Sequence, residues 1–269
     1  MTQQTMTEPA RMSQKFWSVG DYDRLASYGS AAEASHLVRF AAVRPGDRVL
    51  DVGTGSGIVA IVAAQRGASA IGVDPTPELL AKARENARIA GHDDVAWHEG
   101  VAEALPFPDA AFEVVLSQYA HMFSPQPESA AREMLRVLKP GGRLAFAAWT
   151  PQGLGARLME LCVRYSSRPP DGPSPFTWGD PQAVHDYLGQ GVRELGFEHR
   201  ALQLPALSPG HARLLFEETF APVVLLVRAL ADDPARLTKW REEYDHLVSE
   251  FHADGVVRFE YLLTRATKA

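Results

Sequence analysis

Cysteine is nearly absent from this chain of 269 residues, which contains only Cys162. A single cysteine excludes an intramolecular disulfide and a cysteine-rich metal site, and it is typical of a reducing compartment. Long apolar runs are also lacking, since runs such as Val223 to Val227 are far too short to cross a bilayer. The polar residues 1–9 do not resemble a secretory signal. We therefore expect a cytoplasmic protein with no membrane partner.

Runs of lysine and arginine are missing as well, and the formal net charge is -6. Tight nucleic-acid binding draws most of its affinity from basic side chains that neutralise phosphates, so we expect no nucleic-acid partner. The histidines are scattered without the spacing of metal ligands, so we expect no metal site. The hydrophobic fraction of 46% and the charged fraction of 22% are those of an ordinary globular protein.

Short runs rich in valine, isoleucine and leucine alternate with longer helical patterns between Arg48 and Trp149. This alternation predicts parallel β-α-β units, and the continuous apolar character of the strands suits a sheet covered on both faces. The predicted strands are 48–52, 70–73, 95–98, 112–117 and 143–149, and the predicted helices are 58–65, 77–90 and 127–138. The sequence therefore predicts an α/β fold with a doubly wound, mostly parallel sheet.

The sequence after Trp149 has a different pattern. Residues 169–175 are rich in proline and predict an irregular segment, and Asp180 is expected to cap the helix that follows. Two more strands are predicted at 198–204 and 256–263, with two long helices, 211–231 and 234–252, inserted between them. We expect an N-terminal helical lid over residues 1–45, a cofactor-binding core over 46–150, and a part over 151–269 that completes the sheet and carries a helical cap.

A glycine-rich turn, Asp51-Val52-Gly53-Thr54-Gly55-Ser56-Gly57, joins the first predicted strand to the first helix. Ligands of doubly wound sheets bind at the carboxyl ends of the strands, and glycine lets a ligand lie directly against the backbone. Two cofactors fit this turn. Read from Gly55, with Ala60 in third place, it matches a dinucleotide pattern. Asp51, however, would repel a pyrophosphate and attract the ammonium of an amino acid, which favours S-adenosylmethionine.

Asp74 ends the second predicted strand, where a carboxylate can accept hydrogen bonds from both ribose hydroxyls of an adenosine. NAD and S-adenosylmethionine share this adenosine, so Asp74 alone does not separate them. The alternative role for Asp74 is to cap the helix that begins after Thr76.

Four stretches, in order and in spacing, resemble the motifs of class I methyltransferases of the broad group that includes ubiquinone and menaquinone biosynthesis enzymes. They are VLDVGTGSG at 49–57, GVDP at 72–75, AEALPFPD at 102–109 and RVLKPGGR at 136–143. The resemblance covers about residues 45–148. It implies a seven-stranded Rossmann-like sheet with one antiparallel strand near its edge, and S-adenosylmethionine as the cofactor.

The resemblance also implies which residues bind this cofactor. The loop of Gly53, Thr54, Gly55 and Gly57 would pack against the methionine portion. Asp51 would face the ammonium, directly or through water.

Four other positions complete the implied site. Asp74 would bind the ribose, Pro75 would lie on one face of the adenine, and Val101-Ala102-Glu103 would meet the adenine edge. Ser117 would offer its backbone carbonyl to the ammonium. The family often has aspartate where Val101 stands, so the contact to the adenine amino group must come from the backbone or from Glu103.

Methyl transfer from a sulfonium is an in-line displacement that depends chiefly on orientation, and a base is needed only when the acceptor atom must lose a proton. His121 lies just after the fourth predicted strand, where a near-neutral pKa would let it act as that base. A role in holding the loop is the alternative. Tyr119 either lines the pocket or belongs to the core, and Tyr22 and Tyr28 either fold over the cofactor or simply pack.

The acceptor is expected to be a small organic molecule. The segment 117–120, Ser-Gln-Tyr-Ala, lacks the Asn/Asp-Pro-Pro-aromatic motif of base-modifying enzymes and the clustered acids of metal-dependent catechol-type enzymes. Phe176, Trp178 and the two late helices are instead suited to roof an apolar site. Two other functions remain open: an NAD-type oxidoreductase, and a non-catalytic protein that binds S-adenosylmethionine.

Overall fold

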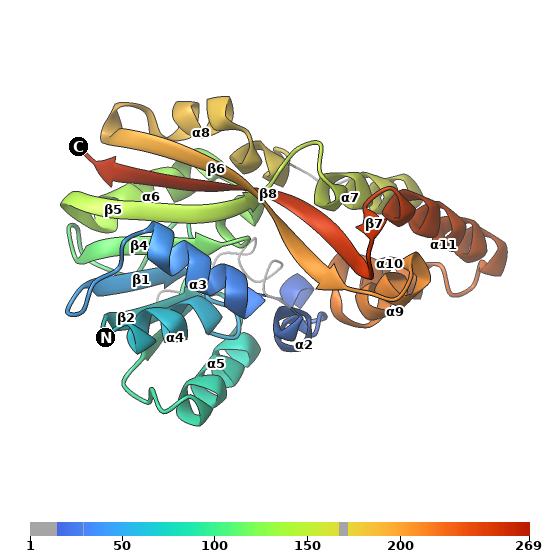
Figure 1. The fold of residues 1–269 in the computed structure, drawn as a ribbon, viewed down its shortest axis with the longest axis horizontal. Coiled ribbons are helices and arrows are strands. Elements are labelled where there is room, and N and C mark those ends of the chain that lie inside the picture. Colours follow the sequence, from blue (N-terminus) through green and yellow to red (C-terminus); the bar gives the residue numbers. More distant parts are fainter. Residues whose placement is uncertain (1–14, 29, 167–171) are drawn as a thin grey trace.

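The computed structural model describes residues 15–28, 30–166 and 172–269. Residues 1–14 and 29 of the expected lid and residues 169–171 of the expected proline-rich segment lie outside the described residues. The core of the molecule is one sheet in the order β3-β2-β1-β4-β5-β8-β6, with the short β7 paired to β8 (Figure 1). The strands are β1 Arg48–Val52, β2 Ser69–Asp74, β3 Ala96–Glu99, β4 Phe112–Gln118, β5 Leu138–Trp149, β6 Val192–Pro205, β7 His252–Ala253 and β8 Val256–Lys268.

Strands β1 to β5 run parallel to one another, and β8 runs antiparallel to both β5 and β6. The predicted α/β fold with a mostly parallel sheet is therefore confirmed. Several boundaries differ from the prediction, since β6 begins at Val192, β8 ends at Lys268 and β5 begins at Leu138, before the Pro-Gly-Gly turn. Leu138 pairs with Phe112, and the pairing then shifts register and resumes between Val114 and Arg143.

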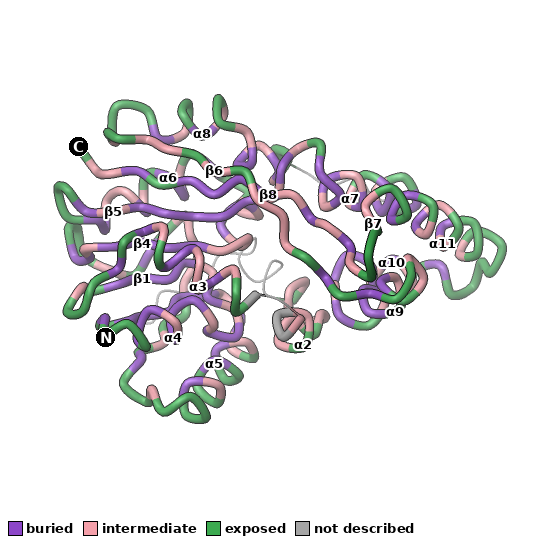
Figure 2. Tube along the Cα trace, in the orientation of Figure 1, coloured by how far each residue is buried: buried purple, intermediate pink, exposed green. Residues whose placement is uncertain are grey.

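Helices cover both faces of the sheet because the central strands alternate their buried side chains. In β4, Val114 and Leu116 pack on one face and Val115 on the other. The first face is covered by α3 (Ser30–Phe40) and α4 (Ile58–Gln65), and the second by α6 (Pro127–Val137) and α8 (Pro181–Leu188). Helix α5 (Pro77–Ile89) follows β2. Figure 2 shows these central strands almost continuously buried.

The C-terminal end of β6 and the N-terminal end of β8 extend past the other strands of the sheet and pack in a separate apolar cluster, which we call the cap. It contains α7 (Leu154–Tyr165), α9 (Pro209–Thr219), α10 (Ala221–Ala229) and α11 (Pro234–Ser249). The predicted continuous helix 211–231 is wrong, since the chain breaks between α9 and α10. Pro222 has no N–H to donate to the carbonyl four residues back, and its ring would clash with that carbonyl, so a continuous helix cannot pass through it. The helix α9 therefore ends at Thr219, and α10 begins at Ala221 with Pro222 in its first turn.

Residues 15–28, which include the short helix α2 (Tyr22–Ser27), form a strap between the core and the cap. In Figure 1 this helix lies between α5 on one side and α9 on the other. Among the described helices, none is both long enough and apolar enough to cross a membrane.

Candidate active site

A cavity of about 640 Å³ opens at the carboxyl ends of β1, β2, β4 and β5. This is the edge at which doubly wound sheets bind their ligands. The strap and the cap close the other sides, and the volume is within the range of about 300–1,000 Å³ typical of small-molecule sites.

The glycine loop after β1 lines one wall of this cavity, and its three glycines have different reasons to be glycine. All three have positive φ, of 67° at Gly53, 54° at Gly55 and 90° at Gly57. A Cβ on Gly53 would lie 2.3 Å from Ala120 Cβ, and one on Gly57 would lie 2.7 Å from the Trp97 ring. A Cβ on Gly55 would meet nothing within 4 Å. Only Gly55 therefore leaves open space where a ligand can approach the backbone.

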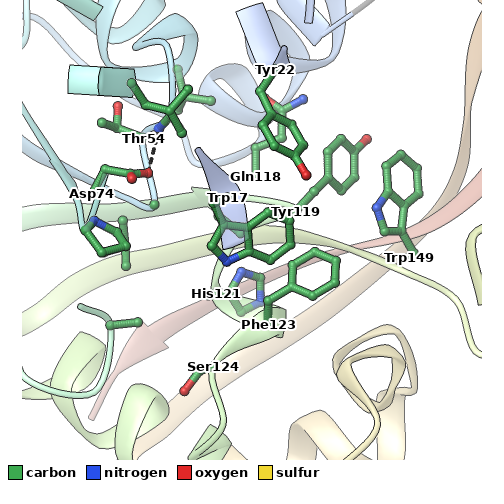
Figure 3. Close-up of a pocket in the computed structure, with 18 of the residues that line it drawn as sticks. Trp17, Tyr22, Thr54, Asp74, Gln118, Tyr119, His121, Phe123, Ser124 and Trp149 are labelled. Carbon is green, nitrogen blue, oxygen red and sulfur yellow. Dashed lines mark hydrogen bonds between the residues drawn. The ribbon is translucent and has the colours of Figure 1, made fainter. Parts of the chain in front are cut away.

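Asp74 joins this loop to the start of α5. Its Oδ2 accepts a hydrogen bond from Gly55 N at 3.0 Å (Figure 3), and its Oδ1 accepts one from Thr76 N at 2.9 Å. Thr76 is the N-cap of α5 and makes no side-chain capping bond, and Asp74 accepts from the N–H of Thr76 itself rather than from one in the first turn of the helix. Burial raises the pKa of Asp74. Asp74 thus shapes the glycine loop and the entry to α5, and it also lines the cavity.

Asp51 lies one residue before the end of β1, and only one of its carboxyl oxygens has a hydrogen-bond partner in the described part of the chain. Thr54 Oγ1 donates to its Oδ2 at 2.6 Å, whereas its Oδ1 is buried and has no hydrogen-bond partner among the described residues. Burial is the main cause that raises the pKa of Asp51 to about 7. A buried acceptor without a donor is costly, and it is the group that a bound ammonium would satisfy.

Ser117 and His121 form a buried hydrogen-bonded pair at the end of β4. Ser117 Oγ donates its single proton to Val52 O at 2.6 Å, so it must accept from His121, whose Nδ1 lies 3.0 Å away. The tautomer of His121 is thereby fixed with the proton on Nδ1. Burial lowers the pKa of His121 to about 3, and its Nε2 is enclosed without a partner. The expectation of a near-neutral pKa is wrong, because the ring lies against Phe146 and Trp178.

Aromatic rings line the cavity at the point where its cofactor end meets the cap. Tyr119, with a φ of 57°, stacks on Trp149 with ring centres 3.8 Å apart and planes 10° apart. Trp149 ends β5 and packs against all three apolar clusters of the described chain. Burial raises the pKa of Tyr119 well above its usual value, so this phenol stays protonated.

The strap covers one side of the cavity and is hydrogen-bonded both to the cap and to the core. Trp17 lies 4.8 Å from the Phe123 ring, and in Figure 3 Trp17 and Tyr22 lie between Asp74 and Trp149. On the cap side, Tyr22 OH accepts from Ala221 N at 3.3 Å, at the break between α9 and α10. On the core side, Asn86 Nδ2 donates both to Asp23 Oδ1 and to Ser56 O in the glycine loop.

The cavity gathers most of the residues expected from the sequence. Those that line it are Tyr22, Asp51, Gly53, Thr54, Gly55, Asp74, Pro75, Val101, Ala102, Glu103, Tyr119 and His121. Gly57 and Ser117 are not among the lining residues, because Gly57 packs under Trp97 and the Ser117 hydroxyl joins Val52 to His121. Sequence reasoning missed Trp17, Gln118, Phe123, Ser124 and Trp149. Trp149 could have been predicted as a lining residue, since it ends a predicted strand at the same sheet edge.

The charges of this cavity fit S-adenosylmethionine better than a dinucleotide. Its ionisable lining residues at the loop end are the carboxyl groups of Asp51, Asp74 and Glu103, and the described lining contains no lysine or arginine. Such a site offers acceptors for an ammonium and for hydroxyls, but no cation to pair with a pyrophosphate.

Comparisons with known proteins agree with this geometry. Residues 50–146 match a family profile described as "Methyltransferase domain". The uncharacterized protein Rv1403c of Mycobacterium tuberculosis is 35% identical over 262 residues, which cover 97% of this chain and 95% of the relative. A putative methyltransferase of Bacillus halodurans, of known crystal structure, is 25% identical with a TM-score of 0.59, and the match covers 88% of this chain and 99% of that one.

This chain belongs to the class I S-adenosylmethionine-dependent methyltransferases. The family predicted from the four motifs is confirmed, and with it the cofactor and the assignment as an enzyme. The oxidoreductase alternative is set aside. Another relative, the arsenite methyltransferase of Halobacterium salinarum, is 36% identical over 134 residues, which cover 47% of this chain and 34% of that protein.

Proposed function

We propose that this methyltransferase acts on a small organic acceptor by in-line methyl transfer. The observation that supports this is a single cavity that runs from the glycine loop, past Tyr119 and Trp149, into the apolar cap. S-adenosylmethionine supplies the activated methyl group. The chain's own contribution is to hold both molecules in line and to exclude water.

The proposed cofactor contacts follow the polar groups of the loop end. Asp51 Oδ1 would accept from the ammonium, and Asp74 would use its remaining lone pairs for the ribose hydroxyls. Gly55 would lie against the methionine portion. Pro75 and the segment 101–103 would surround the adenine, although Glu103 already accepts a hydrogen bond from Ser124 at 2.6 Å.

We do not propose His121 as a general base. With its Nδ1 bound to Ser117, its Nε2 enclosed and its pKa near 3, it is a neutral ring that fixes the end of β4. Tyr119 stays protonated and stacked. Neither side chain is therefore available to take a proton from the acceptor atom.

The test of this function is the formation of S-adenosylhomocysteine from S-adenosylmethionine in the presence of a panel of small organic acceptors. We expect at least one acceptor to raise product formation well above the rate without acceptor. Tight binding of the cofactor with no product from any acceptor would favour the non-catalytic alternative.

Cofactor affinity is expected to depend on pH through Asp51. In the free protein its carboxyl is protonated below pH 7, and an ammonium favours the ionised form. The Kd for S-adenosylmethionine should therefore rise as the pH falls from 7.5 to 5.5, approaching roughly tenfold per unit. Isothermal titration calorimetry across this range measures it. Asp51→Asn should bind more weakly at pH 7.5 with a flatter profile, and an equal slope in both proteins would contradict the assignment.

The strap is proposed to act as the lid over the cofactor, held by Asn86. Asn86→Ala removes the group that links Ser56 O to Asp23. We expect S-adenosylhomocysteine to dissociate about tenfold faster, because lost contacts act mostly on dissociation. Stopped-flow fluorescence of the tryptophans, Trp17 among them, follows this rate. Arg88→Ala on the same helix is the control, since Arg88 pairs with the exposed Glu85. An equal effect of both substitutions would argue against a lid.

A further inference from the structure

The cap end of the cavity differs in chemistry from the loop end. We call this end the acceptor lobe. It is lined by apolar side chains that come from β5, α7, the 175–179 turn, β6, α9, the break after α9 and β8: Trp149, Leu158, Met159, Phe176, Leu202, Leu204, Phe216, Phe220 and Phe259. The lobe is continuous with the cofactor end but shares none of its carboxylates.

Charged side chains of the cap form ion pairs with one another outside the cavity. Arg157 pairs with Glu250, Arg213 with Asp245 and Arg241 with Glu217, and none of these residues lines the cavity. An anionic group in the lobe would thus lack a cation, and an ammonium there would lack a carboxylate. Burying an unpaired ion costs several kcal/mol, whereas apolar surface gains about 25 cal/mol per Å² on burial.

We propose, resting on the methyltransferase function above, that the acceptor is an uncharged apolar molecule that carries no carboxylate, phosphate or ammonium. The rings of the lobe are preorganised for it. Phe216 and Phe259 stack with planes 4° apart, and Trp149 is held between Tyr119 and Phe259. Ordering these side chains on binding therefore costs little, and selectivity comes from the absence of partners for a charge.

Three naphthalenes of similar size test this inference: 1-naphthol, 1-naphthoate and protonated 1-naphthylmethylamine. Binding is measured by calorimetry at pH 7.5 with S-adenosylhomocysteine at saturation. We expect 1-naphthol to bind at least about 30-fold more tightly than either charged probe, which is a difference of roughly 2 kcal/mol. Equal or tighter binding of a charged probe, or no binding of 1-naphthol, would overturn the inference. Failure of S-adenosylhomocysteine itself to bind would instead count against the proposed function.

A charge placed in the lobe gives an independent test. Met159→Lys introduces an ammonium on α7 with a side chain of similar length, and it should reverse the preference toward 1-naphthoate. Leu214→Lys is the matched control on the cap, because Leu214 is 55% exposed and does not line the cavity. The control should keep the wild-type preference. A Met159→Lys protein that binds S-adenosylhomocysteine normally but keeps that preference would show that the ligand does not occupy this lobe.

Discussion

Gly55→Val should abolish measurable binding of S-adenosylmethionine, with a Kd at least about 100-fold higher than that of the wild type. Two causes add. The residue has a φ of 54°, where a β-branched side chain costs about 1–2 kcal/mol. Its Cβ would also enter the open space of the cavity beside Asp74.

Gly46→Val is a control that has the backbone strain but places no side chain in the cavity. Gly46 also has a positive φ, of 84°, and also has nothing within 4 Å of its Cβ, but it does not line the cavity. Both variants should lose a similar amount of stability in thermal unfolding, whereas only Gly55→Val should lose the cofactor in calorimetry. Equal affinities of the two variants would show that the cofactor does not lie against the glycine loop.

Asp74→Ala is expected to weaken cofactor binding by at least tenfold. Hydrogen bonds to a charged group contribute about 1.5–3 kcal/mol each, and this carboxylate is proposed to accept from the ribose hydroxyls. The same substitution leaves the N–H groups of Gly55 and Thr76 without their acceptor, so the Tm of the cofactor-free protein should also fall.

A double-mutant-type cycle distinguishes a direct contact between Asp74 and the ribose from an indirect effect of Asp74 on the shape of the loop. S-adenosylhomocysteine and its 2′-deoxy analogue are titrated into the wild type and into Asp74→Ala. If Asp74 binds the hydroxyl, removing that hydroxyl should weaken binding strongly in the wild type and little in the variant. The same loss in both proteins would reduce Asp74 to a residue that only shapes the loop.

The fold was largely predictable because its signals are local. Apolar runs separated by Gly-rich or Pro-Gly turns located β1, β2 and β4, and the helix α4 was predicted at 58–65, as observed. The helix 211–231 was predicted as continuous because its apolar pattern continues through Phe220. The break there depends on Pro222 and is stabilised from a distance, where Tyr22 OH accepts the N–H of Ala221.

The site was less predictable because burial is not local. The low pKa of His121 comes from its enclosure by Phe146 and Trp178, which are distant in the sequence. Gly57 looked like a ligand contact, yet Trp97 from β3 accounts for the absence of a side chain there. The division into a lid over 1–45, a core over 46–150 and a cap-bearing part over 151–269 stays a prediction.

The most direct test of the account is a crystal structure of the protein with S-adenosylhomocysteine. We predict that the amino-acid portion lies against Gly55 with its ammonium at Asp51, that Asp74 accepts from the ribose, and that the sulfur faces the acceptor lobe past Tyr119 and Trp149. A ligand bound away from Gly55, or one whose sulfur faces away from the lobe, would contradict it.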